Sequence, residues 1–246
     1  MSYISIFNSL STARQNLGER YRMKKYCFYV VHNIDFRELL DSLDTGSVDL
    51  IVTDPPYARG YESCYGEMAK RAKRVLRRGG SLITLCGHHQ LARILPTMGE
   101  HLKYRWIIKH DQPGASRRLA MGIRTTWKPM LWYVNEVLSP NVCVADTVNA
   151  TKVKTSGHPW EQSEMYAAWA IGHLTKEGET IVDPFAGSGT TLVVAQKLKR
   201  KWVGSETDEI WCERANQRVY GQLGIPDLGE MPQTELDDER SRELEI

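Results

Sequence analysis

The chain has 246 residues, of which 41% are hydrophobic and 25% are charged, and its formal net charge is +2. This length and composition suit one soluble α/β domain with a sizeable core, and they exclude a disordered or fibrous protein. No apolar run is long enough to cross a membrane and the N-terminus lacks a signal-peptide core, so we expect a cytoplasmic protein. The five cysteines form no Cys-x-x-Cys pair, which argues against a disulfide framework and against a zinc site.

Charge is distributed unevenly along the chain. Residues 227–246 contain eight acidic residues and two arginines, a net charge of −6, which leaves +8 for the rest. A basic body is typical of proteins that bind a polyanion. The acidic end, poor in large apolar side chains, predicts a solvated, disordered tail over residues 223–246. We therefore divide the chain into an N-terminal arm at residues 1–24, one domain over residues 25–222, and this tail.

The first half of the domain shows strand and helix patterns in alternation. In chain order they predict a strand at Tyr26–Val31, a helix at Asp35–Leu43, a strand at Val48–Thr53, a basic helix at Met68–Leu76 and a strand at Ser81–Cys86. Val48–Thr53 is a short, mainly apolar run, the pattern of a strand buried on both faces. Gly79-Gly80 would close the basic helix that precedes it.

The second half continues the alternation after two strands. The patterns predict strands at Tyr104–Lys109 and Met130–Val134, a helix at Glu161–Leu174, a strand at Thr180–Val182, a helix at Thr190–Lys199, a strand at Trp202–Ser205 and a helix at Glu209–Tyr220. Strands and helices that alternate at this spacing predict an α/β fold, with a mostly parallel sheet covered by helices on both faces.

A glycine-rich turn lies between a predicted strand and a predicted helix, where an open α/β sheet binds a nucleotide-like ligand. It reads Asp183-Pro184-Phe185-Ala186-Gly187-Ser188-Gly189-Thr190-Thr191. Its glycines let the backbone approach a ligand, and the helix N-terminus offers free N–H groups. It lacks the third glycine of a dinucleotide fingerprint and the Gly-Lys-Ser/Thr of a phosphate-binding loop. The leading Asp183 would also repel a pyrophosphate.

A second acid, Glu206, lies 23 residues after Asp183, at the end of the next predicted strand. A carboxylate at that place can accept both hydroxyl groups of a ribose. The two acids therefore indicate an adenosine ligand without phosphate, such as S-adenosylmethionine. The structural alternative is an ordinary tight turn followed by a capped helix.

The string Asp54-Pro55-Pro56-Tyr57 directly follows the buried strand Val48–Thr53. Its prolines fix the local φ angles and hold the loop rigid at the carboxyl edge of the sheet. The Asp54 carboxylate and the Pro55 carbonyl are two acceptors, and Tyr57 supplies a flat face for a base. Two acceptors that hold an exocyclic amine expose its lone pair, which can then attack a sulfonium methyl group in line. A base must leave the duplex to reach such a pocket. The structural alternative is a rigid loop that caps a strand.

Together these two strings resemble the amino-group DNA methyltransferases, whose catalytic motif is (D/N/S)PP(Y/F). The catalytic string precedes the cofactor string, as in the family's β class, a circularly permuted version of the Rossmann-like methyltransferase fold. The match covers roughly residues 26–220, and Arg74–Ser81 resembles the family's RVLkpGG segment. The resemblance implies that Asp54, Pro55, Pro56 and Tyr57 are catalytic and that S-adenosyl-L-methionine is the cofactor.

The resemblance extends the expected cofactor site to two further segments. Asp35, 19 positions before Asp54, matches an acidic position near the cofactor's adenine ring. His158-Pro159-Trp160 resembles the family's HPT-x-KP segment, although Trp160 replaces threonine and Gln162-Ser163 replaces Lys-Pro. The residues expected to bind the cofactor are Asp35, Asp54, His158, Asp183, Phe185, Ala186, Gly187, Ser188, Gly189, Thr190, Thr191 and Glu206.

Short recognition inserts are expected at about residues 110–128 and 136–157. Basic residues between two predicted strands would contact DNA phosphates there, with a solvated loop as the alternative. Arg59 and Tyr61, just after the catalytic loop, would order the target strand. The residues expected to bind nucleic acid are Arg59, Tyr61, Arg117, Arg118, Arg124 and Lys128.

Some conspicuous side chains favour a structural interpretation. Tyr65, Trp202 and Trp211 are expected to pack in the core rather than to stack on bases. The His88-His89 pair has no third ligand nearby in sequence, so a surface or hydrogen-bonded pair is favoured over a metal site.

The patterns and the resemblance together predict a restriction-modification type of DNA methyltransferase that transfers a methyl group to adenine N6. In the family, Asp at the first position of the catalytic motif goes mostly with adenine and Ser mostly with cytosine N4. Cytosine N4 is therefore the first alternative target. RNA or a protein amide nitrogen is another, although enzymes of that substrate class tend to have Asn at the position of Asp54. A catalytically silent DNA-binding protein is the alternative from another class. The expected partner is DNA, with a homodimer as in many β-class relatives left open.

Overall fold

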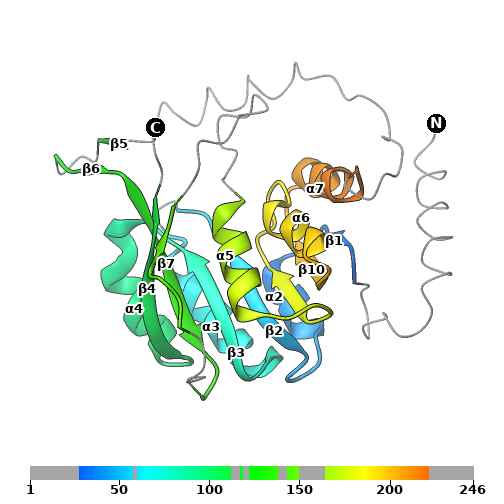
Figure 1. The fold of residues 1–246 in the computed structure, drawn as a ribbon, viewed down its shortest axis with the longest axis horizontal. Helices are drawn as coiled ribbons and strands as arrows, with labels where there is room; N and C mark the ends of the chain where they lie inside the picture. The colour runs from blue at the N-terminus through cyan, green and yellow to red at the C-terminus, as the bar shows by residue number, and fades with distance from the viewer. Residues whose placement is uncertain are drawn as a thin grey trace, which may run out of the picture.

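The computed structural model describes residues 28–57, 60–111, 117–118, 122–137, 143–149 and 164–221. Eight strands form one sheet in the order β1-β10-β9-β2-β3-β7-β4-β8 (Figure 1). Their bounds are β1 (Val31–His32), β2 (Val48–Thr53), β3 (Leu76–Leu85), β4 (Lys103–Asp111), β7 (Trp127–Val134), β8 (Thr147–Val148), β9 (Thr180–Asp183) and β10 (Lys201–Ser205). Strand β7 runs antiparallel to β3 and β4, and the other pairs are parallel. The predicted mostly parallel sheet is thereby confirmed.

Helices cover both faces of the sheet (Figure 1). One face carries α5 (Met165–Leu174), α6 (Thr190–Lys197) and α7 (Glu209–Gly221). The other carries α2 (Phe36–Ser42), α3 (Glu62–Val75) and α4 (Leu91–Gly99), which follows a short 3-10 helix, η2 (His88–Gln90). A separate two-stranded hairpin consists of β5 (Arg117–Arg118) and β6 (Arg124–Thr125).

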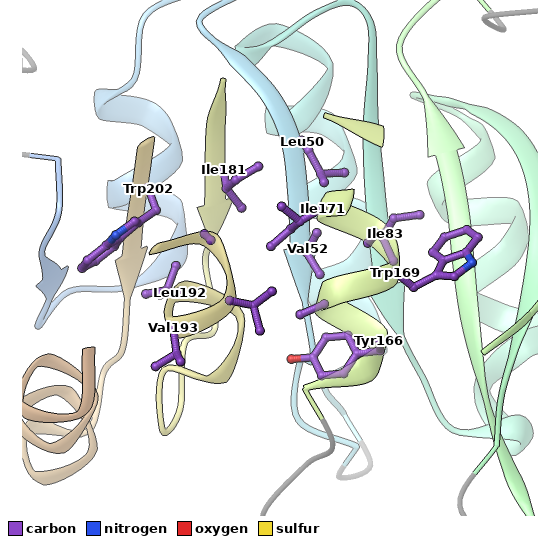
Figure 2. Packing of buried hydrophobic residues seen from close by; sticks show 14 of the residues in the cluster. Leu50, Val52, Ile83, Tyr166, Trp169, Ile171, Ile181, Leu192, Val193 and Trp202 are labelled. Atoms are coloured by element: carbon purple, nitrogen blue, oxygen red, sulfur yellow. The ribbon is translucent and has the colours of Figure 1, made fainter. Parts of the chain in front are cut away.

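The core consists of two layers, one on each side of the sheet. Side chains of successive strand residues point to opposite faces, so Leu50 and Val52 of β2 pack toward α5 while Ile51 packs toward α2 and α3. Figure 2 shows the layer that includes α5 and α6, with Ile171 of α5 next to Val52 of β2, and Trp202 on β10. Each fully buried aliphatic side chain contributes about 1.5–3 kcal/mol, so the central strands hold the loops at their ends firmly in place.

Most of the predicted elements are confirmed, but the region around α3 differs. Helix α3 begins at Glu62, six residues before its predicted start at Met68, and buries Cys64 and Tyr65 as well. Gly79 and Gly80 lie inside β3 rather than closing the helix. The helix ends because Leu76 has extended backbone angles and starts the strand directly. Helix α4 was not predicted, and Pro96 within it obscured its pattern.

The first strand was placed too early. The prediction was Tyr26–Val31, whereas the described strand is Val31–His32. Tyr29 has a φ of +63°, which interrupts an extended backbone. Its amide still donates to the Trp202 carbonyl oxygen at 2.7 Å, so the segment follows β10 without being a regular strand.

The predicted N-terminal arm at residues 1–24 and the predicted acidic tail at residues 223–246 both lie outside the described residues. The two predicted inserts are described only in part. In the described part of the chain, no helix is long and apolar enough to span a membrane.

Candidate active site

The two sequence strings meet at the carboxyl edge of the central strands. Strands β2 and β9 are parallel neighbours, with Leu50 opposite Ile181 and Ile51 opposite Val182. The last residue of β2, Thr53, donates its hydroxyl hydrogen to Asp183 Oδ1 at 2.7 Å. Asp54 therefore begins its loop directly beside the residue that leads the glycine-rich turn.

The glycine-rich turn is tight because two of its residues have left-handed backbone angles. Gly187 has a φ of +50° and Gly189 a φ of +78°. A side chain at Gly189 would also press against Ala215 of α7, at 3.1 Å from its Cβ atom. The turn is held down where the Ala186 amide donates to the Ser205 carbonyl oxygen at 2.9 Å. Glycine is thus required for conformation here, whatever ligand the turn receives.

The second predicted acid, Glu206, is bound to this same turn. Its Oε2 accepts from the Gly187 amide at 2.9 Å, and its Oε1 accepts from the Asp208 amide at 3.0 Å. The structure thus brings Asp183, Gly187 and Glu206 together at the ends of β9 and β10. A carboxylate oxygen accepts more than one hydrogen bond, so Glu206 can hold a hydroxyl group in addition to these amides.

Asp183 is almost completely buried, with an exposed fraction of 2%. Burial away from water raises the pKa of its carboxyl group to about 7, against the lowering effect of hydrogen bonds from Thr53 and Thr191 and from the Phe185 amide. A strongly perturbed acid at the edge of a parallel sheet is typical of a ligand-binding site. The Thr191 hydroxyl also lies 3.0 Å from the hydroxyl of Tyr166 on α5.

The predicted adenine side of the cofactor site is built by α2. Asp35 is the N-cap of this helix and accepts from the Arg37 amide at 2.8 Å. The next residue is Phe36, and the centre of its ring lies 4.8 Å from the centre of the Phe185 ring in the glycine-rich turn. Asp35 and the turn therefore lie at one end of the sheet, and the role of Asp35 beside the cofactor stays a prediction.

The Asp54-Pro55-Pro56-Tyr57 loop makes its own contacts. The Tyr57 hydroxyl donates to Asp54 Oδ1, and Gln90 Nε2 donates to the Tyr57 carbonyl oxygen at 3.3 Å. Lys128 of β7 approaches both residues, with Nζ 3.8 Å from Asp54 Oδ2 and 3.4 Å from the Tyr57 hydroxyl. The expected catalytic residues and Lys128 thus form one cluster.

The other residues expected to bind nucleic acid are less closely grouped. Tyr61 is 49% exposed at the start of α3, and Arg124 is exposed on β6. The backbone register places Arg118 opposite Arg124. Beside the hairpin lies a cavity lined by His88, His89, Ile123, Arg124, Thr125, Thr126 and Trp127. Arg59 and His158 lie outside the described residues.

The structure adds residues that sequence reasoning did not single out. Gln90 and Thr53 hold the two loops, and His110 of β4 is buried beside Tyr166, with ring centres 5.9 Å apart. Of these three residues, only Thr53 could have been found from the sequence, because it directly precedes Asp54. Of the predicted core aromatics, Tyr65 and Trp202 are buried as expected, whereas Trp211 is partly exposed.

Family profiles match two parts of the chain. Residues 140–217 match the DNA methylase family, and residues 6–104 match the RMKL-like methyltransferase domain. The chain is similar to type II methyltransferase M2.DpnII of Streptococcus pneumoniae, at 40% identity over 26% of this chain and 24% of that protein. It is also similar to type II methyltransferase M.HpaI of Haemophilus parainfluenzae, at 23% identity over 75% of this chain and 72% of that protein. The match thus spans about a quarter of the first relative's length.

Solved structures agree on the architecture. The M1.HpyAVI–SAM complex has a TM-score of 0.64 and 19% identity, over 77% of this chain and 98% of that one. The cytosine-N4-specific PvuII DNA methyltransferase has a TM-score of 0.67 and 18% identity, over 90% of this chain and 94% of that one. The chain has the Rossmann-like methyltransferase fold. The predicted fold class is therefore confirmed, and the loops described above lie on a methyltransferase scaffold.

Proposed function

We propose that this chain is a DNA methyltransferase that transfers a methyl group from S-adenosylmethionine to the N6 amino group of adenine. The observation that carries the proposal is the hydrogen bond from Thr53 to Asp183, which joins the loop of Asp54 to the glycine-rich turn. The proposed site for the target amine and the proposed cofactor site are thereby adjacent. The matches to the DNA methylase family and to type II methyltransferases support DNA methyl transfer, and the choice of adenine N6 rests on Asp54.

The residues at the turn suit S-adenosylmethionine. Glu206 lies where a carboxylate accepts the hydroxyl groups of a ribose, and Phe36 with Phe185 offers an aromatic surface for the adenine ring. Asp183 provides a buried acid for a cationic ligand. The cofactor supplies an electrophilic methyl group bound to a positively charged sulfur.

The chain's own contribution to the chemistry is to hold and expose the amine. The Asp54 carboxylate and the Pro55 carbonyl accept the two N–H groups, and the Tyr57 ring stacks on the base after it has left the duplex. Positive charge develops on the nitrogen as it attacks the methyl group. A carboxylate fixed beside that nitrogen stabilises this charge better than a neutral acceptor does.

DNA contacts are proposed for the basic residues near this edge. Arg124 on β6 is exposed, and the hairpin of β5 and β6 precedes β7, which carries Lys128 into the site. Arg59, Tyr61, Arg117 and Arg118 complete the proposed contact surface. Such contacts would position the duplex without reading its sequence.

Substitution of Asp54 tests the reaction. Asp54→Ala should lose nearly all methyl transfer to unmethylated DNA, whereas cofactor affinity should fall much less, because Glu206 and Asp183 are unchanged. Asp54→Asn, which keeps the shape and loses the charge, should also be severely impaired. The measurement is transfer of a labelled methyl group, with calorimetric titration of the cofactor as the control. Full activity in Asp54→Ala would overturn the mechanism.

The target base is decided by mass spectrometry of digested product DNA. N6-methyladenine is expected, since Asp at position 54 goes mostly with adenine in the resembling family. The second candidate is cytosine N4, because the PvuII DNA methyltransferase, which has a similar fold, is specific for it. Detection of N4-methylcytosine without N6-methyladenine would replace the adenine assignment and leave the reaction type intact.

Substitution of Glu206 tests the cofactor site. Glu206→Ala should weaken S-adenosylmethionine binding by about 1–3 kcal/mol, the scale of lost charge-assisted hydrogen bonds. Glu209→Ala is a matched control, because Glu209 is an exposed glutamate in the first turn of α7, three residues after Glu206. Calorimetry that gives the same affinity for Glu206→Ala and the control would show that Glu206 is only a loop-holding residue.

A further inference from the structure

The acceptor proposed for the target amine already has two partners within the chain. One oxygen of Asp54, Oδ1, accepts the hydroxyl hydrogen of Tyr57. The other, Oδ2, faces the ammonium group of Lys128 at 3.8 Å. The side chains of Asp54 and Lys128 are only 15% and 24% exposed, so water screens their attraction less than at an open surface.

The same ammonium group also lies beside the Tyr57 ring, toward its hydroxyl group. Lys128 Nζ lies 4.8 Å from the centre of the Tyr57 ring, within the range of a cation–π interaction. It therefore contacts both the carboxylate that should hold the amine and the ring that should hold the base. A flipped base and this ammonium group compete for one place.

The position of Lys128 is fixed by the sheet rather than by a loop. It lies in β7 directly opposite His110 of β4. His110 is 1% exposed, and neither of its ring nitrogens has a hydrogen-bond partner in the described part of the chain. Burial, followed by the nearby positive charge of Lys128, lowers the pKa of His110 to about 4. His110 is therefore neutral at pH 7 and offers no counter-charge, while the neighbouring Asp111 is paired with Lys109 at 2.8 Å.

An ammonium group at this place would oppose the reaction. The amine nitrogen gains positive charge during methyl transfer, and a second cation a few ångströms away repels it. Lys128 is also only four residues after Arg124 in the chain, so the proposed phosphate-binding hairpin leads directly into the strand that carries it.

We propose that Lys128 is a positioning residue that occupies the base site in the DNA-free protein and moves to a target-strand phosphate when the base enters. This rests on the proposed function and makes it more specific. It couples backbone binding to base entry, so that the site opens to a nucleotide in DNA and stays closed to a free nucleoside.

The first test observes the Tyr57 ring directly. The chain is labelled with 3-fluorotyrosine, and the Tyr57 fluorine signal is identified by its loss in Tyr57→Phe. In the DNA-free protein this signal should differ between wild type and Lys128→Ala, and it should resemble wild type in Lys128→Arg. Free deoxyadenosine should shift the signal of Lys128→Ala at a concentration about five-fold lower than in wild type, because the competing cation–π contact is lost.

The second test measures the salt dependence of binding to an unmethylated DNA duplex by fluorescence anisotropy. Lys128→Ala should reduce the slope of log Kd against log salt concentration by about one unit, and Lys128→Arg should restore it. Lys109→Ala is the matched control, since Lys109 lies on the adjacent strand and is paired with Asp111. Lys109→Ala should leave the Tyr57 fluorine signal unchanged.

Two results would overturn the proposal. One is a Tyr57 signal that is the same in wild type and Lys128→Ala, with equal deoxyadenosine midpoints or no shift in either. The other is an unchanged salt slope in Lys128→Ala. Neither readout requires methyl transfer, so failure of the proposed function would be recognised separately, as a wild-type chain that binds DNA and transfers no methyl group.

Discussion

Asp183 has a structural role and lies in the proposed cofactor site, and its surroundings have opposite effects on its protonation. Hydrogen bonds from the Thr53 hydroxyl at 2.7 Å and the Phe185 amide at 3.1 Å favour the carboxylate. Complete burial favours the neutral acid and has the larger effect, so the pKa rises to about 7. A cationic ligand beside it would favour the carboxylate.

The raised pKa of Asp183 predicts a pH dependence of stability. An unfolded Asp has a pKa near 3.9, so between about pH 4 and pH 7 the folded chain binds more protons than the unfolded chain. The contribution of this residue to stability therefore falls as pH rises through that window. Asp183→Asn should make the free energy of unfolding decrease less steeply with rising pH. Urea unfolding at several pH values measures this. Asp44→Asn, at an exposed position, is the control. An equally steep fall in Asp183→Asn would contradict the assignment.

At the scale of elements, α2 depends on an arginine from another helix. Arg74, near the end of α3, donates from Nη1 to the Leu43 carbonyl oxygen and from Nη2 to the Leu40 carbonyl oxygen, both at 2.7 Å. These carbonyls lie at the C-terminus of α2, where a helix leaves its last acceptors unsatisfied. The arginine of the RVLkpGG-like segment therefore fixes the helix whose N-terminus carries Asp35.

Removal of Arg74 should weaken this connection. Arg74→Ala is expected to lower the free energy of unfolding by about 1–3 kcal/mol, because two acceptors lose a charged donor. Arg74→Lys should be intermediate, since lysine lacks the two-pronged donor. Arg78→Ala, whose side chain is 76% exposed, should stay within about 0.5 kcal/mol of wild type. Denaturant unfolding measures all three, and equal stability of Arg74→Ala and Arg78→Ala would refute the role.

At the scale of the whole molecule, the acidic residues are concentrated outside the part of the chain that forms the sheet and its helices. The eight-stranded sheet and its helices include residues 31–221, whereas the strongly acidic segment is residues 227–246. The composition of that segment offers little apolar surface to bury. It should therefore contribute to electrostatics and not to folding.

Deletion of residues 227–246 tests this separation. The melting temperature should stay within about 2 °C of the full chain, because no core contact is expected to be lost. Binding to non-specific DNA should tighten at low salt, since a net charge of −6 is removed. Thermal unfolding and anisotropy titrations measure the two effects. A fall of about 5 °C or more would show that the segment is packed against the domain.

Local patterns were sufficient for much of this molecule. Strand β2 has the predicted bounds because five of its six residues are apolar or β-branched and the strand ends at a proline-containing loop. The glycine-rich turn was recognised because left-handed backbone angles select glycine at Gly187 and Gly189. Patterns failed where a local feature concealed the element. Pro96 concealed α4, and the positive φ of Tyr29 cannot be read from the identity of a tyrosine.

The sequence by itself determined the alternation of strands and helices, the two loops and the acids that lead them, because period, turn chemistry and loop rigidity are local properties. Only the tertiary structure decided that Thr53 bonds Asp183, that Gln90 holds Tyr57, and that Lys128 lies over the Tyr57 ring. The partners in these contacts are 130, 33 and 71 residues apart in the chain. Contacts at such separations depend on strand order and register, which hydrogen bonds and burial across the whole sheet select together.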